Sequence, residues 1–435
     1  MMNTTIVSIC VFLIVNMCFA EELARFHADM NNSGQFHDTI LKPPLKLKWR
    51  YFSEGTFKTG PIVMNGRLFA TDRQGQIYCV NSETGELIWK RYYLATESVT
   101  PIAWGEYLYY HETGTNLDDR TGSLRCVNQS DGKDVWIKSN VGGTIYNRGK
   151  YSPQIFNGKL YFFSSTGTTS NTATLYCINA LTGETSWEKV IGPISDAQGI
   201  VPSHILVCTL STKPFIISAY SSNAQLNWRS KYGKAFAVTA DSGRLLWETE
   251  VYHSVHCIYD TMLYAHTTSP SIQGIIAASV FTGDTVYGKK VTAAYKLSAT
   301  DKYLFTRSYG SDVNFIDRLT GNTIGGCDFS SIPIPFGGRV LSGCGFISMA
   351  NGYGYCGFGH GGYSTSTYNP PGGIPRADKA QGVYAFEIPK NNETKLKVVW
   401  YYKMASNICS TPYIANGKIY YTTNQEGAIY CFENK

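Results

Sequence analysis

Hydrophobic and polar residues alternate in short runs along most of the chain, and one arrangement of these runs keeps returning. The stretch from Gln74 to Lys90 shows it in full. IYCV is an apolar run, SETG is polar and ends in glycine, and ELIW is a second apolar run that ends at Trp89. Two runs rich in β-branched and aromatic residues, joined by a short polar segment with glycine, predict a β-hairpin.

The hairpin pattern recurs at an interval of ~40–50 residues, which is typical of propellers and other repeat arrays. Each copy follows a proline-containing run, a turn such as Asn-Gly and an aromatic run, so the repeat is predicted to have four strands. The clearest further copies are LRCVNQSDGKDVW, LYCINALTGETSW and FAVTADSGRLLW, which end at Trp136, Trp187 and Trp247, and less regular copies end at Tyr287 and Ile324.

The two ends of the array are incomplete in complementary ways. The last copy, STPYIANGKIYYTTNQEGAIYCFENK, lacks a fourth strand, whereas LKLKWRYF (Leu45–Phe52) is a spare strand with a tryptophan, Trp49. Pairing Leu45–Phe52 with Ala428–Phe432 would close a ring and remove two open sheet edges. With seven complete copies and one shared copy, the sequence predicts an all-β fold, an eight-bladed β-propeller of four-stranded antiparallel blades.

The tryptophans that end the repeats are expected to pack between neighbouring blades, where a large ring buries much apolar area. Four cysteines share one repeat position and are predicted to be small buried residues, because equivalent positions in different blades lie too far apart for a disulfide. These four are Cys79, Cys126, Cys177 and Cys431. Cys344 and Cys356, predicted on consecutive strands, are the pair to test for a disulfide.

Composition agrees with a turn-rich β protein. Of 435 residues, 42 are glycine and 14% are aromatic, whereas only 16% are charged, below the ~25% of typical soluble domains. The net charge is +6, but no run of Lys and Arg is longer than two. This scattered charge predicts no nucleic-acid partner.

Residues 1–20 are predicted to be a signal peptide cleaved after Ala20, because IVSICVFLIVNMCFA is an apolar run that ends in small residues. The run is shorter than the ~20 apolar residues of a membrane span, so we expect a secreted or periplasmic protein without a transmembrane segment. Residues 21–45, with Pro43-Pro44, are predicted to be an extended lead-in. Residues 46–435 form a single propeller, with an insertion at 357–380 in blade seven.

The segments TPYIANGKIYYTTNQEGAIYCFE and IYCVNSETGELIWK resemble the repeats of the pyrroloquinoline-quinone-like (PQQ-like) β-propeller superfamily. Its members include quinoprotein alcohol dehydrogenases and the assembly scaffold BamB. The resemblance covers residues 24–435 and implies a propeller fold. In the quinoproteins it would imply a quinone over the propeller axis, a vicinal Cys–Cys disulfide, a catalytic Asp and Ca²⁺. The chain has no adjacent cysteine pair and no Cys-x-x-Cys-His haem motif, so we expect no bound cofactor.

Five residues are candidates for ligand binding: Arg148, His256, Arg307, His360 and Arg376. Arg148 and Arg307 stand at strand ends among Tyr and Asn, where they could hold an anionic or glycan ligand. His253 and His256 face opposite sides of a strand, which argues against zinc and for a histidine lining a polar channel. The last two lie in the insertion, and long loops tend to carry function.

These observations predict a monomeric, non-catalytic binding or protein-interaction scaffold with an unidentified protein or glycan ligand at the propeller face. No catalytic residue and no metal site is assigned. Two alternatives remain open. One is a quinoprotein-like dehydrogenase that oxidises an alcohol or sugar, and the other is a carbohydrate-active enzyme that uses the blade-seven loop.

Overall fold

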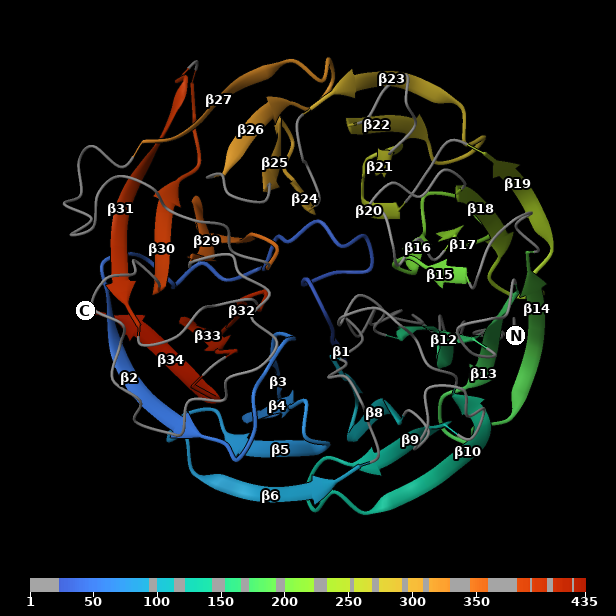
Figure 1. Cartoon of the computed structure of the whole chain (residues 1–435), viewed down its shortest axis with the longest axis horizontal. Coiled ribbons are helices and arrows are strands. Elements are labelled where there is room, and N and C mark those ends of the chain that lie inside the picture. The colour runs from blue at the N-terminus through green and yellow to red at the C-terminus, as the bar shows by residue number, and fades with distance from the viewer. Residues whose placement is uncertain are drawn as a thin grey trace, which may run out of the picture.

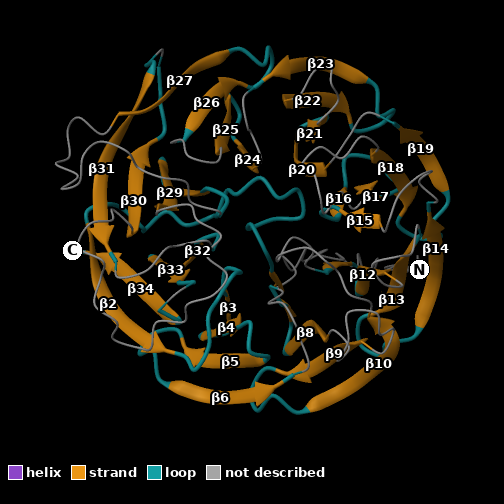
Figure 2. Ribbon diagram, viewed as in Figure 1, coloured by secondary structure: helices purple, strands orange, loops and turns teal. Residues whose placement is uncertain are grey.

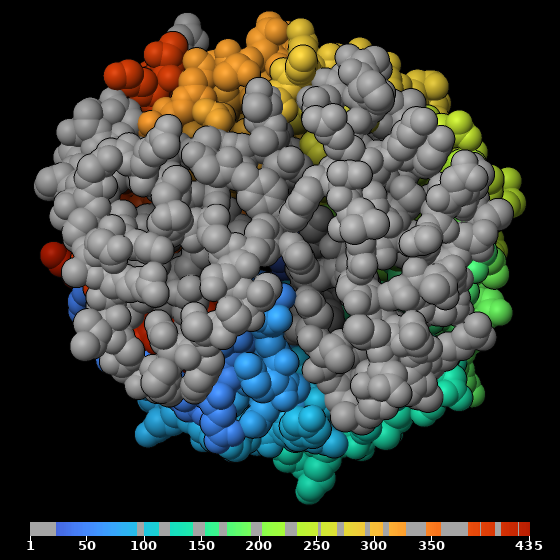
Figure 3. Space-filling view, viewed as in Figure 1, coloured from blue at the N-terminus to red at the C-terminus, as the bar shows by residue number. Residues whose placement is uncertain are grey.

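The computed structural model describes residues 23–93, 100–112, 122–142, 153–165, 172–192, 200–222, 233–250, 254–267, 274–291, 296–307, 313–328, 345–358, 382–391, 393–404, 410–424 and 426–435. All regular secondary structure in these ranges is β-strand, arranged as sheets around a ring (Figures 1 and 2). The described residues follow one another around the rim in chain order, from blue to red (Figure 3). The fold is therefore an all-β propeller.

The first half of the ring consists of antiparallel sheets whose strands run in chain order from the centre to the rim. They contain β3 (Ile62–Met64), β4 (Arg67–Thr71), β5 (Gln76–Asn81) and β6 (Leu87–Tyr92); β1 (Leu23–Ala24), β7 (Ile102–Trp104), β8 (Tyr107–Glu112), β9 (Gly122–Asn128) and β10 (Asp134–Gly142); β11 (Gln154–Phe156), β12 (Lys159–Ser165), β13 (Ala173–Asn179) and β14 (Thr185–Ile191); and β15 (Ile200–Pro202), β16 (Leu206–Cys208), β17 (Phe215–Ser222), β18 (Gly233–Thr239) and β19 (Leu245–Thr249).

The second half includes the one sheet of eight strands among the described residues. Its sheets contain β20 (Ser254–Tyr259), β21 (Met262–Thr267), β22 (Gly274–Ser279) and β23 (Thr285–Lys290); β24 (Lys296–Ala299), β25 (Tyr303–Arg307), β26 (Asn314–Asp317), β27 (Thr323–Asp328), β28 (Ser348–Ala350), β29 (Tyr353–Phe358), β30 (Gly382–Glu387) and β31 (Lys395–Lys403); and β32 (Tyr413–Ala415), β33 (Lys418–Thr422), β34 (Ala428–Asn434) and β2 (Leu45–Phe52). The ring thus comprises seven hydrogen-bonded sheets.

The predicted closure of the ring is confirmed. β2 pairs antiparallel with β34, in a register that runs from Leu45 opposite Asn434 to Phe52 opposite Ala428. The Lys48 ammonium lies 2.9 Å from a Glu433 oxygen beside this pairing. The first long strand of the chain therefore supplies the outer strand of its last sheet.

Tryptophans fix the outer strand of one sheet to the next sheet, as predicted. The Trp187 indole on β14 donates a 3.1 Å hydrogen bond to the Ala240 carbonyl of the neighbouring sheet. Gly243 approaches the ring so closely that a Cβ would lie 2.7 Å from it, and its φ of +68° also favours glycine. We call this contact the latch. Equivalent latches are made by Trp49, Trp89, Trp136 and Trp247, with Tyr287 as a phenol version.

The latch is missing where the eight-stranded sheet joins its two halves. Gly325 stands at the repeat position of the tryptophan, and β27 instead pairs parallel with β31, from Gly326 opposite Lys395 to Asp328 opposite Lys397. A Cβ on Gly325 would lie 1.7 Å from the Thr394 carbonyl oxygen. The missing side chain therefore allows the two outer strands to meet.

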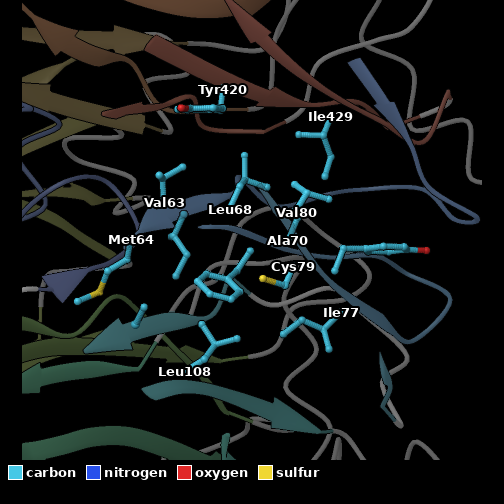
Figure 4. Close-up of a cluster of buried hydrophobic side chains, with 14 of the residues drawn as sticks. Val63, Met64, Leu68, Ala70, Ile77, Cys79, Val80, Leu108, Tyr420 and Ile429 are labelled. Atoms are coloured by element: carbon cyan, nitrogen blue, oxygen red, sulfur yellow. The ribbon is translucent and has the colours of Figure 1, made fainter. Parts of the chain in front are cut away.

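Apolar side chains fill the space between neighbouring sheets. Figure 4 shows one such cluster, where Leu68 and Cys79 of the β3–β6 sheet pack beside Leu108 of the next sheet and Ile429 of the last. The four cysteines predicted to be buried are buried. Burial raises the pKa of the Cys79 thiol to about 12, so it stays protonated at neutral pH.

Candidate functional site at the propeller hub

The centre of the ring is occupied by the N-terminal segment of the chain itself. We call residues 23–42 the belt, and the innermost strands β3, β7, β11, β16, β20, β24, β28 and β32 the hub. In Figure 1 the belt is the dark blue segment that crosses the middle of the ring. It begins as β1, which pairs with β7, and ends near β34, where the Ile40 carbonyl accepts a 2.9 Å hydrogen bond from the Asn434 amide.

The belt is bound largely through its main chain. Its carbonyl groups accept hydrogen bonds from backbone N–H groups of four successive inner strands, and the Phe36 N–H donates to the Met349 carbonyl. The four accepted bonds run from Val207 to Met30 (3.2 Å), from Ile258 to Asn31 (2.8 Å), from Ala299 to Ser33 (2.9 Å) and from Met349 to Gly34 (2.7 Å). The belt thereby supplies partners for strand edges that would otherwise face the axis unpaired.

A tight turn in the belt is organised by Asp29. One carboxylate oxygen accepts hydrogen bonds from the backbone N–H groups of Asn31 (2.9 Å) and Ser33 (3.0 Å), and the other accepts one from the Ser33 hydroxyl. Such an arrangement is an Asx turn. Burial raises the pKa of Asp29, and the bonds from Ser33 oppose that shift. His27, Ala28 and Asn32 have positive φ values here, a conformation that non-glycine residues rarely adopt.

Aromatic rings fill the axis beside this turn. The Phe26 ring stacks on His204 with centroids 5.4 Å apart and meets Phe346 edge to face at the same distance. The His27 ring lies 4.6 Å from Phe346. His27 Nε2 is 3.0 Å from the Ser298 hydroxyl and 3.1 Å from the Ile347 carbonyl oxygen. Phe346 thus lies between two belt side chains and the inner strands.

Charge at the hub is basic and mostly enclosed. The Arg25 guanidinium donates a 2.8 Å hydrogen bond to the Gln154 side chain, and the Lys296 ammonium lies 4.7 Å above the centre of the Phe346 ring. Burial lowers the pKa of His27 to about 4, with the charge of Lys296 adding to that effect. His27 is therefore a neutral imidazole at physiological pH.

His256, predicted to line a polar channel, belongs to this hub. It lies on β20, is buried, and its Nε2 is 3.0 Å from the Ser254 hydroxyl. Its ring centroid lies 5.9 Å from that of Phe346 and 6.1 Å from that of His204. The side chain therefore faces the aromatic cluster, and a role in ligand binding stays a prediction.

Arg307 links the two halves of the eight-stranded sheet. Its guanidinium donates hydrogen bonds to the backbone carbonyls of Gly345 (3.3 Å), which precedes β28, and Gly357 (2.6 Å), which lies on β29. The side chain is buried at the end of β25. These contacts hold neighbouring strands together, and ligand binding by this residue remains a prediction. The other three candidates, Arg148, His360 and Arg376, lie outside the described residues, as does Cys344 of the cysteine pair to be tested for a disulfide.

Sequence reasoning missed the belt as a functional element, because its residues show no periodicity. Two local signals could have pointed to it. Asp29 with Ser33 four residues later is typical of an Asx turn, and Gly34 follows directly. A Cβ on Gly34 would lie 2.4 Å from His27 Nε2 and 2.6 Å from the Ile347 oxygen, so glycine is needed for this close approach.

The repeats, the latches and the closed ring define the class of protein as a β-propeller built from PQQ-like repeats. The sequence profile of the family described as outer membrane protein assembly factor BamB matches residues 45–289. This match covers more than half of the chain, and the chain belongs to this family. No curated protein matches the sequence.

Solved structures share the fold at low sequence identity. BamB from Moraxella catarrhalis has a TM-score of 0.55 and 12% identity, over 89% of this chain and 99% of that one. Quinohemoprotein alcohol dehydrogenase from Comamonas testosteroni has a TM-score of 0.62 and 11% identity, over 93% and 79%. A europium-containing methanol dehydrogenase has a TM-score of 0.57 and 10% identity, over 93% and 96%. Such identities establish the fold alone.

The hub does not fit the quinone and metal ion that the dehydrogenase branch implies. Within the described ranges, no group of three or more His, Cys, Asp or Glu side chains could hold a metal ion. The sequence has no adjacent cysteines to form a vicinal disulfide. The axis itself is filled by Phe26, His27 and Phe346. Across the same ranges, no helix is long and apolar enough to cross a membrane.

Proposed function

We propose that this protein is a secreted, monomeric PQQ-like propeller that acts as a non-catalytic interaction scaffold and binds a protein or glycan at a propeller face. The observation that carries the proposal is the hub filled by the belt. Buried aromatic rings and main-chain hydrogen bonds occupy the axis, which is where a quinone would be expected from the resemblance. A filled axis suits a rigid platform that binds partners by its surface.

We further infer that the propeller has eight blades. The eight-stranded sheet has two antiparallel halves, β24–β27 and β28–β31, whose strands pair with each other through the three residue pairs of the parallel join. Counting each half as a blade also agrees with the latches, because Trp400 on β31 donates a 2.9 Å hydrogen bond to the Leu45 carbonyl on β2. Each half then occupies one position in the ring.

Reconstitution with pyrroloquinoline quinone and Ca²⁺ tests the scaffold against the dehydrogenase. We expect no stoichiometric change in quinone absorption and no dye reduction with a panel of alcohols and sugars, because the rings of Phe26, His27 and Phe346 pack together at the axis. A known quinoprotein dehydrogenase, loaded in parallel, is the positive control. A one-to-one spectral change with substrate-dependent dye reduction would contradict the scaffold function.

Export is tested separately by mass spectrometry of the protein from its native source. We expect the mature chain to begin at Glu21, because cleavage is predicted after Ala20. An intact Met1 would contradict export, and a lipid on Cys18 would contradict the predicted cleavage site. Cross-linking in the same extract, followed by identification of the linked protein or glycan, would name the partner.

A further inference from the structure

We propose that the hub is a peptide-recognition surface and that the belt is its built-in occupant, held in cis in place of a segment of a partner protein. The proposal rests on the scaffold function and names the chemistry of the partner. The belt meets the inner strands in the order β7, β11, β16, β20, β24, β28 and β32, so one segment of the chain is contacted by seven inner strands in turn.

The manner of binding is general rather than particular to this sequence. The hub donates the backbone N–H groups of Val207, Ile258, Ala299 and Met349 to carbonyls of the belt. Main-chain hydrogen bonds give affinity to any peptide that follows the same backbone path, and side-chain contacts select among such peptides. The edges of the inner strands are thus prepared for a peptide whether it comes in cis or in trans.

Two belt side chains supply the selection. Phe26 lies between His204 and Phe346, which act as an aromatic socket. The Asp38 carboxylate accepts a hydrogen bond of 2.6 Å from the Gly417 N–H at the turn between β32 and β33. The partner segment should therefore offer an aromatic side chain near one end, form a turn like that at Asp29, and carry a carboxylate about a dozen residues beyond the aromatic residue.

The bound belt contains strained backbone conformations and an unsatisfied buried polar atom, as expected of an occupant that can be displaced. His27 and Ala28 have φ values of 59° and 77°, which L-residues rarely adopt. The side-chain oxygen of Asn32 is buried without a hydrogen-bond partner. A partner segment without these defects would compete well once the advantage of covalent attachment is removed, since attachment gives the belt a high effective concentration.

The test uses the full chain with a site-specific protease sequence inserted between Thr39 and Ile40, both exposed. Cleavage then frees the belt from β2 without removing any residue. The probe is a fluorescein-labelled synthetic peptide of residues 21–39, followed by fluorescence anisotropy and gel filtration. We expect the cleaved chain to take up one labelled peptide, the uncleaved chain to take up none, and a scrambled peptide not to bind.

Matched variants make the result specific. Gly34→Ala should speed release of the belt from the cleaved chain at least tenfold, because its Cβ would meet His27 and the Ile347 carbonyl. Gly352→Ala, at a similar φ of +79° but with nothing within 4 Å of its Cβ, should leave the release rate unchanged. A labelled peptide with Phe26→Ala should bind at least tenfold more weakly.

Two outcomes would overturn the proposal. The cleaved chain could keep its own belt and exclude excess probe up to the melting transition, or it could lose its near-ultraviolet circular dichroism together with the belt. Either result would make the belt part of the core rather than a displaceable occupant. Neither depends on quinone loading, so failure here and failure of the scaffold function are separate results.

Discussion

The rim and the hub of this ring are held together by different means. At the rim, one device is repeated: a tryptophan on the outer strand donates its indole N–H to a carbonyl of the next sheet, over a glycine in a turn. At the hub, a single non-repeated segment contacts successive inner strands, partly through backbone hydrogen bonds and partly through side chains such as Arg25 and His27. Neighbouring sheets are thus joined pairwise at the rim and all together at the hub.

The difference shows how a repeat protein can be both regular and specific. The latches depend on residues that recur with the repeat, so losing one affects one boundary between sheets. The belt is unique in sequence and touches all sheets, so a change in it is felt around the ring. We therefore expect rim substitutions to change stability locally, whereas hub substitutions should also change binding.

The largest effect is expected from removing residues 21–52, which takes away both the belt and β2. The β34 edge would lose its partner strand and the Trp49 latch, so we expect aggregation or loss of the cooperative melting transition. Removing only residues 21–40 should leave a folded ring with a lower melting temperature.

Removal of residues 361–379, inside the predicted insertion, is the length control for the 21–40 deletion, because loop length alone costs little. Calorimetry and light scattering give the readouts. If the 21–52 deletion melts like the full-length protein, closure by β2 would not be what holds the rim.

Trp49→Ala is the largest expected single substitution at the rim. Trp49 is buried over Gly85 and donates a 3.1 Å hydrogen bond to the Ser82 carbonyl, so its loss should lower the free energy of unfolding by about 4 kcal/mol. Urea unfolding measures this change. Trp49→Phe keeps ring area and loses only the indole N–H, and should cost about 1 kcal/mol. Equal losses for the two variants would show that the ring does not carry the latch.

Acid should weaken the hub before the rim. Burial holds the pKa of His27 near 4, below its ordinary value of 6.5, so the folded protein takes up this proton later than the unfolded chain does. Above pH 6.5 this histidine is neutral in both states and does not reduce the free energy of unfolding. As the pH falls from 6.5 to 4, the unfolded chain is protonated first, and the free energy of unfolding decreases by about 3 kcal/mol. Unfolding free energies at pH 7.5 and 4.5 measure the slope.

His27→Gln should reduce this pH slope, whereas His37→Gln, at an exposed belt position, should leave it unchanged. His111 on β8 is also buried with its pKa lowered to about 4 by burial, and His111→Gln is the matched change away from the belt. If the unfolding free energy of His27→Gln depends on pH as strongly as that of the unmodified protein, His27 is not a source of the acid sensitivity.

Gly325→Ala tests the join between β27 and β31, where a glycine stands at the repeat position of the latch tryptophan. A Cβ there would lie 1.7 Å from the Thr394 carbonyl oxygen, so β27 and β31 must separate, at a cost of about 2 kcal/mol. Gly288→Ala, on the exposed outer strand β23, is the control and should be neutral or slightly stabilising. A neutral Gly325→Ala would mean that the parallel join adds little to this boundary.

The smallest effect is expected for Lys48→Ala. Its ammonium lies 2.9 Å from Glu433 and 3.1 Å from Glu83, bridging the last sheet and the first. The groups are partly exposed to solvent, so the loss should be about 0.5–1 kcal/mol and should vanish in 1 M salt. A loss that persists in high salt would point to packing of the Lys48 stem instead.

The rim could be predicted from the sequence because its features repeat. The hairpin pattern gave the strands, Trp89 and Trp187 marked the outer ones, and the incomplete ends gave the pairing of Leu45–Phe52 with the last strand. The count of eight blades stays a prediction, since β27 and β31 merge two predicted blades into one sheet. The two predicted blades merge because Gly325 replaces a tryptophan. This effect could not be predicted from the repeat alone, since it depends on Thr394, far along the chain.

The hub could not be predicted in the same way. Its contacts join belt residues to positions hundreds of residues away, such as His27 to Ile347, and no periodicity relates the two. The prediction that His256 lines a polar channel remains a prediction, and its proximity to Phe346 follows only from the closed ring. Arg307 was expected to face a ligand, and its observed partners are backbone carbonyls of a neighbouring strand.

The pairing of β2 with β34 has a consequence for the order of folding. The Lys48–Glu433 contact joins residues 385 positions apart, whereas most other paired strands, apart from β1 with β7 and β27 with β31, are close neighbours in the chain. During synthesis those local sheets can form as soon as they emerge, but the ring must stay open until the last strand is released. A ribosome stalled a few residues short would therefore hold an open ring, with the edges of β2 and β33 free to pair with another chain.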